Sequence, residues 1–467
     1  MKSRLIVLTD ICRGLENDDI ESMVRLLLYS NEIDLEGLIA ATSCWAKKAA
    51  TEKEKKLILK IVDAYANVRE NLSIHADGYP DPDDLRRKVC CGVAKYGRCL
   101  GDGFGEASLN ENDGVRLIID AADQNDERPL WIAIWSGANT LAQAVWKVQT
   151  TRSAADLERF LSKLRVYAIS DQDEGGHWLR QTFGDRLFYI VSPSPAEGSR
   201  YYFHATWPGI SADRAKHGSP DGLRPNGFRG TDAELVSRRW LRKNIRSHGL
   251  YGKQYPIFRF IMEGDTPSYL SLIPNGLNDP EHPGYGGWGG RYQHYRPDEA
   301  YTGTKEIFPV WTNASDTVVG CDGKEYRSPQ ATIWRWRDAF QNDFAARMDW
   351  TVSHDYRGAN HPPIVKLAHA NKLQAFGGQR ISLSAEGTYD PDGDVLHYAW
   401  MFYREAGTYQ GNVEIENSGS RDASLIVPDV SEKAEIHVVL SVTDGGDPPL
   451  TRYQRVVIHV EPSSKAF

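Results

Sequence analysis

The sequence has no run of about 18 apolar residues, the length that a helix needs to cross a membrane. We therefore expect no membrane-spanning segment and no membrane partner. It also has no block of basic residues. In total, 55 Lys and Arg and 63 Asp and Glu give a formal charge of −8. This balance argues against nucleic acid as a partner and favours neutral or cationic ligands.

The six cysteines include no Cys-X-X-Cys pair and no zinc-site spacing. Low-complexity tracts and internal repeats of about 20–50 residues are also absent, which argues against a solenoid. Residues 1–9 predict a strand rather than a signal peptide. We therefore expect a cytoplasmic protein, unless the sequence is a mature or trimmed form, in which case the periplasm or the outside of the cell is favoured.

Apolar material is ample, with 41% hydrophobic and 25% charged residues in a chain of 467. This length favours two or three domains. Aromatic residues reach 10%, with 13 Trp and 22 Tyr, and many lie in stretches rich in Gly and Pro. That composition is a weak indication of carbohydrate binding.

Strand and helix patterns alternate in the first part of the chain. Apolar runs predict strands at 5–8, 35–42, 129–135, 164–170 and 187–191. Helical spacing predicts helices between them, at 20–30, at 52–68, from about 140 and at 178–183. This order predicts an α/β fold with a mostly parallel sheet flanked by helices, in which ligands bind at the carboxyl ends of the strands.

The pattern changes after about residue 197. The stretch to 350 is rich in Gly, Pro, Tyr and Trp and contains one helix-like segment at 331–350. After a break at 354–363, short alternating segments predict an all-β, Ig-like sandwich: 380–385, 396–402, 423–428, 435–443 and 453–460. We therefore expect an α/β domain over 1–355 and a sandwich over 361–467.

Acidic residues gather after the first predicted strand, at Asp10, Glu16, Asp18 and Asp19. Packed together, they would repel one another unless a cation or sugar hydroxyls engage them. Calcium binds six to eight oxygen atoms, and such a loop can supply several of them. The alternative is that Asp18 or Asp19 caps the following helix. Because one cap needs only one acid, we favour a ligand site.

Other polar groups follow later strands or lie far along the chain. Residues 135–139 are mostly small, so the backbone could approach a ligand there, or Asn139 could cap a helix. Residues 171–173 carry two carboxylates and an amide and follow a predicted strand at the same edge of the sheet. They could contact a ligand there, or they could form a polar loop without a function. Residues 263–266 include Asp265, which could return to the acidic loop or cap another helix.

These segments resemble a nucleoside-hydrolase-like family that occurs with a cellulose-binding-protein type of carboxyl-terminal domain. The resemblance is carried by five stretches: 9–43, 135–145, 169–192, 262–277 and 284–292. A more distant likeness to inosine-uridine-type nucleoside hydrolases follows the same order of elements. It implies a nucleoside-hydrolase-like sheet and one Ca²⁺ ion that holds the nucleophilic water and the sugar hydroxyls.

The resemblance implies a role for each matching position. Asp10 would be the general base and a calcium ligand, and the other calcium ligands would be Asp19, the Ala138 carbonyl and Asp265. The substrate-binding residues would be Asp18, Gln172, Asp173 and Glu263.

The sequence also departs from the hydrolase pattern. Seven residues separate Asp10 from Asp18 in place of three, and Leu8 replaces the first acid of the family loop. Gly264 stands where purine-active hydrolases have a His that helps the base to leave. An N-glycosidic and an O-glycosidic bond therefore both stay open, since both cleave through oxocarbenium-like states. The acid that protonates a leaving sugar is likewise open among Glu16, Asp173, His177 and Glu263.

Two further segments suggest ligand contact. In the glycine-rich stretch 284–292, we expect Trp288 to stack on a sugar and Arg291 to donate hydrogen bonds. Three other tryptophans are expected in the core: Trp207, Trp334 and Trp336. Residues 390–394 (DPDGD) suit either a weak calcium site or a tight turn, of which we favour the turn. The sandwich resembles PKD-like and cadherin-like domains, with Trp400 as its core aromatic.

The leading hypothesis is a calcium-dependent hydrolase of N- or O-glycosidic bonds that acts on a small sugar, a nucleoside or an oligosaccharide. The alternative is a non-catalytic protein that binds cellulose or another polysaccharide in a degenerate pocket. A purely structural module is a third and weaker interpretation. Association into a homo-oligomer is left open.

Overall fold

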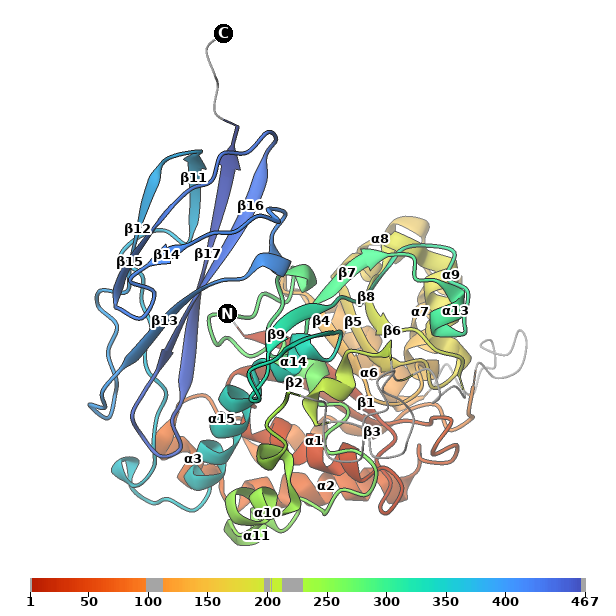
Figure 1. The fold of residues 1–467 in the computed structure, drawn as a ribbon. Helices are drawn as coiled ribbons and strands as arrows, with labels where there is room; N and C mark the ends of the chain where they lie inside the picture. Colours follow the sequence, from red (N-terminus) through yellow and green to blue (C-terminus); the bar gives the residue numbers. More distant parts are fainter. Residues whose placement is uncertain (1, 98–111, 197–201, 203, 212–229, 463–467) are drawn as a thin grey trace.

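The computed structural model describes residues 2–97, 112–196, 202, 204–211 and 230–462. Figure 1 shows two parts, an α/β domain and a β-sandwich that stands against one side of it. Among the described residues, no helix combines the length and the apolar character that crossing a membrane requires.

An eight-stranded sheet forms the centre of the α/β domain, in the order β3-β2-β1-β4-β5-β6-β8-β7. All neighbours pair in parallel except β7 and β8, which are antiparallel. The strands are β1 (Ser3–Thr9), β2 (Ile33–Ala40), β3 (Val89–Cys91), β4 (Leu130–Ile134), β5 (Leu164–Ser170), β6 (Phe188–Ser192), β7 (Tyr292–Tyr295) and β8 (Val310–Asn313). The five predicted strands and the parallel sheet are thus confirmed, and β3, β7 and β8 extend them.

Successive side chains of β1 enter different cores, as the period of a strand requires. Leu5 and Val7 belong to the core that α1 and α15 cover, whereas Ile6 and Leu8 belong to the core under α6 and α7. The helices of this layered part are α1 (Asn17–Leu28), α2 (Glu52–Ala66), α3 (Arg69–His75), α4 (Pro82–Arg87), α6 (Asp113–Asp123), α7 (Asn139–Thr151), α8 (Ala154–Lys163) and α9 (Glu174–Phe183). Both faces of the sheet are covered, which explains why its strands are apolar runs.

The region after β6 consists mostly of short elements. The predicted helix at 331–350 is two helices, α14 (Ala331–Trp334) and α15 (Arg337–Trp350), and the latter packs against α1. The other elements are η4 (Trp207–Ile210), η5 (Glu234–Val236), α10 (Arg238–Leu241), η6 (Arg242–Arg246), α11 (Gly249–Gly252), α12 (Pro267–Leu270), η7 (Pro283–Tyr285), α13 (Glu299–Thr302), β9 (Asp316–Val319), β10 (Glu325–Ser328) and η8 (Tyr356–Gly358).

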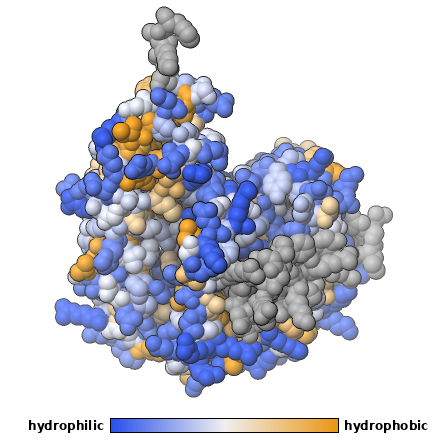
Figure 2. Space-filling model, viewed as in Figure 1, coloured by the Kyte–Doolittle hydropathy of each residue, from blue (hydrophilic) through white to orange (hydrophobic). Residues whose placement is uncertain are grey.

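The sandwich contains two sheets, β11-β17-β16-β13 and β12-β15-β14. Its strands are β11 (Lys372–Phe376), β12 (Arg380–Ser384), β13 (His397–Phe402), β14 (Ile415–Glu416), β15 (Asp422–Ile426), β16 (Ala434–Thr443) and β17 (Thr451–Glu461). The sequence predicted five of these and missed β11 and β14. Trp400 lies in the core as expected. Figure 2 shows that most of the surface in this view is hydrophilic, with a patch of apolar side chains on the sandwich.

Buried charged residues join the two domains. Asp316 of β9 pairs with Arg291 and Arg335 of its own α/β domain and accepts a hydrogen bond from the Tyr403 hydroxyl of the sandwich. Asp343, on α15, pairs with Arg452 on β17 at 2.7 Å. Such pairs are costly to break because they leave an uncompensated charge in the interior. The sandwich is therefore fixed to the α/β domain through its β16–β17 side.

Candidate functional site

A cavity of about 300 Å³ lies at the carboxyl ends of β1, β4 and β5. From β1 the chain adds β2 and β3 on one side and later β4, β5 and β6 on the other. The order of the strands therefore reverses at β1. Open α/β sheets bind ligands at such switch points. The lining residues are Leu15, Glu16, Asp18, Asp19, Trp45, Trp135, Ile169, Ser170, Gln172, Tyr202, Trp207, Phe260, Ile261, Gly264 and Asp265.

The acidic residues of this site come from three places in the chain. Asp10 follows β1, the pair Asp18 and Asp19 lies in the first turn of α1, and Asp265 precedes α12. Asp10 is not among the lining residues of the cavity, but its charge acts on Asp19 and Asp265. Side-chain oxygens of Glu16, Asp18 and Asp19 all lie within 4.8 Å of one another. The helix-capping alternative is wrong for the acidic loop, since Glu16 is the cap residue of α1 and no side chain caps it.

Hydroxyl groups fix two of the carboxylates. The Thr9 hydroxyl donates to Asp19, and the Ser43 hydroxyl donates to Asp10. Ser43 Oγ also accepts the backbone N–H groups of Trp45 and Ala46, so its direction is set by the loop after β2. By contrast, Oδ2 of Asp265 is buried with no hydrogen-bond partner among the described residues. Hard cations such as Ca²⁺ bind several oxygen atoms, and carboxylate oxygens are among their preferred ligands. The unpartnered oxygen of Asp265, together with the neighbouring acids, fits this preference.

Burial and mutual repulsion raise the pKa values of these acids. Burial raises the pKa of Asp10 to about 7, with Asp18 adding to the shift and the Ser43 hydrogen bond opposing it. Burial, with the charges of Asp10 and Asp18, raises the pKa of Glu16 to about 10. The pKa values of Asp19 and Asp265 are also raised, first by burial and then by neighbouring acids. A cation would offset these penalties and favour the ionised forms.

Gln172 lines the cavity, as its predicted role requires. Its Nε2 donates to the Trp135 carbonyl at 2.6 Å, and its Oε1 is buried with no hydrogen-bond partner among the described residues. The amide is thereby oriented by strand β4 and leaves an acceptor available to a ligand.

Asp173 and Ala138 have structural roles at two helix starts. Asp173 accepts hydrogen bonds from the backbone N–H groups of Ala138, Asn139 and Gly175, at 3.0, 3.0 and 2.8 Å. It thus caps α9 and holds the start of α7, where the expected cap, Asn139, is not the cap residue. The Ala138 carbonyl accepts the helix bond from Ala142. Neither residue lines the cavity, and the roles of Asp173 as a sugar contact and Ala138 as a metal ligand stay predictions.

Glu263 belongs to the core rather than to the cavity. Its carboxylate pairs with Arg25 of α1 at 2.8 Å and accepts the Tyr255 hydroxyl at 2.7 Å. Its backbone φ is 54°, a left-handed conformation that is uncommon for a residue with a side chain. The chain therefore turns sharply just before Gly264 and Asp265, which enter the cavity. The expected substrate contact of Glu263 does not agree with this buried position.

Trp288 and Arg291 do not agree with their expected role in ligand binding either. Trp288 has no exposed surface and lies between the domains, with its Nε1 3.4 Å from the Tyr453 hydroxyl. Arg291 pairs with Asp316 at 2.6 Å in the domain interface. The glycine-rich stretch is therefore a packing segment. Trp334 and Trp336 are buried as expected, whereas Trp207 is buried and also lines the cavity.

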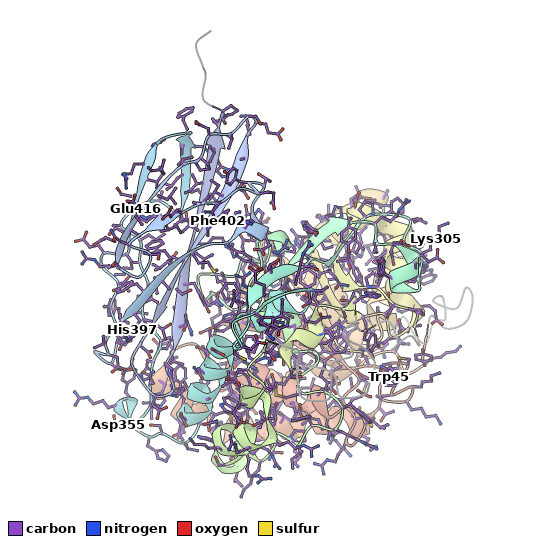
Figure 3. All side chains as sticks on the ribbon, in the orientation of Figure 1. Trp45, Lys305, Asp355, His397, Phe402 and Glu416 are labelled. Carbon is purple, nitrogen blue, oxygen red and sulfur yellow. The ribbon has the colours of Figure 1, made fainter. Side chains whose placement is uncertain are left out.

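Sequence reasoning missed several lining residues, above all Trp45, Tyr202 and Phe260. Trp45 follows β2 at the same edge of the sheet as Asp10, so the rule that ligands bind at strand ends could have found it. Figure 3 places Trp45 on the part of the α/β domain away from the sandwich residues Phe402 and Glu416. Phe260 lies outside regular elements, and neither Tyr202 nor Phe260 belonged to a sequence pattern that marked it.

The doubly covered parallel sheet and the acidic cavity at its switch point define a nucleoside-hydrolase-like α/β protein with an added sandwich. Two family models match the chain. One, described as "Cellulose-binding Sde182, nucleoside hydrolase-like domain", matches residues 4–292, and the other, "Cellulose-binding protein Sde0182, C-terminal domain", matches residues 380–460. This chain belongs to the cellulose-binding Sde182 family.

A solved structure supports the same assignment. It is described as a nucleoside hydrolase-related hypothetical protein from Saccharophagus degradans that is associated with carbohydrate metabolism. It is 35% identical, covers 99% of this chain and 100% of its own, and gives a TM-score of 0.78. The PKD domain from KIAA 1837 protein is 16% identical, over 22% of this chain and 90% of its own, with a TM-score of 0.17. The cadherin domains 1–4 of protocadherin gamma B7 are 18% identical, over 21% and 25%, with a TM-score of 0.13. Because these two TM-scores are low, the resemblance of the sandwich to PKD-like and cadherin-like domains stays a prediction. No curated protein matches the chain.

Proposed function

We propose that this chain is a calcium-dependent hydrolase of glycosidic bonds, N-linked or O-linked, with Asp10 as the general base. The observation that supports the proposal most directly is the cluster of acids at the switch point, in which Asp265 keeps an unpartnered, buried oxygen. A buried carboxylate oxygen without a partner is unfavourable, and its position beside other acids is explained by a cation or a reaction.

Different acidic residues would bind the metal, bind the sugar and accept the proton. Asp19 and Asp265 would hold Ca²⁺ together with Asp10, and Asp18 would bind a sugar hydroxyl. The ion, when bound, supplies positive charge that orients water and sugar hydroxyls and favours deprotonation of water. Asp10 would accept that proton on the carboxylate that the Ser43 hydroxyl orients. Burial of the acids keeps bulk water from competing with these contacts.

A binding function without turnover is the second candidate. Gly264 stands where purine-active relatives place a leaving-group His, and a Cβ there would lie 2.9 Å from Asp18 Oδ2. The position therefore carries no side chain that could assist a leaving base. The matching family is described as cellulose-binding, so the alternative ligand is a polysaccharide.

The test is hydrolysis of nucleosides and nitrophenyl glycosides, β-riboside included, with calcium and then with EDTA. We expect release that needs calcium and falls at least about a hundredfold in Asp10→Asn, since a general base contributes about 10²–10⁴-fold. The matched control is Asp63→Asn, whose side chain is 60% exposed on α2. Equal release with EDTA, or equal rates in Asp10→Asn, would refute the proposal. Tight glycan binding without any release would favour the second candidate.

A further inference from the structure

Aromatic side chains line the mouth of the cavity, where the proposed chemistry does not use them. Trp45 and Phe260 line the cavity yet keep 43% of their surface exposed, and Leu15 keeps 49%. Tyr202 and Trp207 form a buried wall beside them, with ring centroids 5.2 Å apart. Large apolar side chains that stay exposed around a hollow are typical of a binding surface.

Besides Oδ2 of Asp265, two buried polar atoms of the cavity lining have no hydrogen-bond partner among the described residues. They are Oε1 of Gln172, an acceptor, and Nε1 of Trp207, a donor. The Gln172 assignment is fixed because its Nε2 donates to the Trp135 carbonyl. Leaving such groups unpaired is unfavourable. A hydroxyl both donates and accepts, so a polyhydroxylated ligand can satisfy both demands.

The charged residues of the described lining are all acidic: Glu16, Asp18, Asp19 and Asp265. No His, Lys or Arg belongs to it, so apart from the proposed Ca²⁺ ion the lining offers an anionic ligand no partner of opposite charge. At Gly264, a Cβ would lie 3.3 Å from the Trp207 ring, which leaves the backbone close to the aromatic wall. The described residues of the mouth thus offer flat apolar faces, unpaired neutral polar atoms and no basic side chain.

We infer that the mouth of the cavity is a subsite for a second, neutral sugar ring, which stacks on Trp45 and Phe260 and hydrogen-bonds to Gln172 and Trp207. The inference rests on the proposed function, because it places the scissile bond between a sugar held at the acids and this outer ring. The substrate class is then a neutral disaccharide or oligosaccharide, cut at an O-glycosidic bond, rather than a nucleoside.

The experiment measures binding apart from turnover. Cellobiose and adenosine are titrated by calorimetry, with calcium, into the full chain carrying Asp10→Asn, and into the same protein with Trp45→Ala, Trp45→Tyr or Phe376→Ala added. Phe376 is the matched control, an aromatic that is 57% exposed on β11 of the sandwich. We expect cellobiose to bind more tightly than adenosine. Trp45→Ala should raise its Kd about tenfold, which corresponds to about 1.4 kcal/mol. Trp45→Tyr should recover most of the affinity, and Phe376→Ala should change nothing.

Three results would overturn the subsite: no cellobiose binding, a cellobiose Kd that Trp45→Ala leaves within about twofold, or tighter adenosine binding that Trp45→Ala abolishes. The outcome is separable from that of the proposed function. Calcium-dependent nucleoside hydrolysis without cellobiose binding would support the hydrolase proposal and refute the sugar subsite. Cellobiose binding that depends on Trp45, without hydrolysis of any substrate, would support the subsite and refute the hydrolase proposal.

Discussion

Asp343 offers a quantitative test of how firmly the sandwich is attached. The residue lies on α15, and its side chain is 3% exposed. It accepts hydrogen bonds from the Tyr29 hydroxyl at 2.7 Å and Arg347 at 3.1 Å, and it pairs with Arg452 of the sandwich at 2.7 Å. Asp343→Asn keeps the shape but removes the charge that both arginines face.

The expected loss in the free energy of unfolding of Asp343→Asn can be worked out in two ways. Breaking a buried ion pair costs about 3–5 kcal/mol. Independently, Arg452 and Arg347 hold the pKa of Asp343 at about 2, below its usual 3.8 despite burial. The difference of nearly two pH units corresponds to about 2–3 kcal/mol at neutral pH. Unfolding entropy of about 2.1 cal/mol/K per residue, over 467 residues, gives about 1 kcal/mol per degree. We therefore expect Tm to fall by about 2–5 °C, the range that the two estimates span.

The sign of the pH dependence follows from the lowered pKa. The contribution of Asp343 is complete above pH 3.8 and is lost as pH falls toward 2, because the unfolded state then binds more protons. The assay is scanning calorimetry of wild type, Asp343→Asn and the exposed control Asp63→Asn between about pH 7 and 3. Wild type should give one transition, and the gap to Asp343→Asn should narrow as pH falls. Two separate transitions in wild type, or a Tm change under about 1 °C, would refute the reasoning.

Two further substitutions test the site and its support. Gly264→Ala places a Cβ 2.9 Å from Asp18 Oδ2, the proposed sugar-binding carboxylate, so substrate affinity and turnover should fall about tenfold or more while Tm changes little; unchanged kinetics would contradict this. Asp173→Ala removes the acceptor of three backbone N–H groups at the starts of α7 and α9, and at about 1 kcal/mol per cap it should lower Tm by about 2–3 °C. An unchanged melting curve would show that these N–H groups find other partners.

The sequence predicted the parts of the molecule whose signals are local. Apolar runs such as 129–135 and 164–170 located strands, and the strand-end rule placed Asp10 and Asp19 at one edge because they lie close along the chain. From the residues alone, Asp265 stayed open between the acidic loop and a helix cap, since 245 residues separate it from Asp19, and only the family resemblance favoured the acidic loop. The structure places Asp265 in the same cavity as Asp19.

The errors came from residues whose roles depend on distant partners. Trp288 in a glycine-rich stretch has the composition of a sugar-binding loop, but Tyr453 of the sandwich covers it. Arg291 is committed to Asp316, and Glu263 to Arg25, and neither partner is close in sequence. Composition alone does not distinguish an aromatic that packs from one that binds. The contacts that decide it join residues that are far apart in the sequence.

The two ends of the central sheet also bear on how copies of this chain behave at high concentration. Its outermost strands are β3, with three residues, and β7, with four, whereas the inner strand β2 has eight. A long open edge would offer a row of free backbone groups to another molecule and invite aggregation. Edges this short offer few such groups, so sheet-to-sheet growth is disfavoured. Backbone pairing between copies through the edges of this sheet is therefore disfavoured.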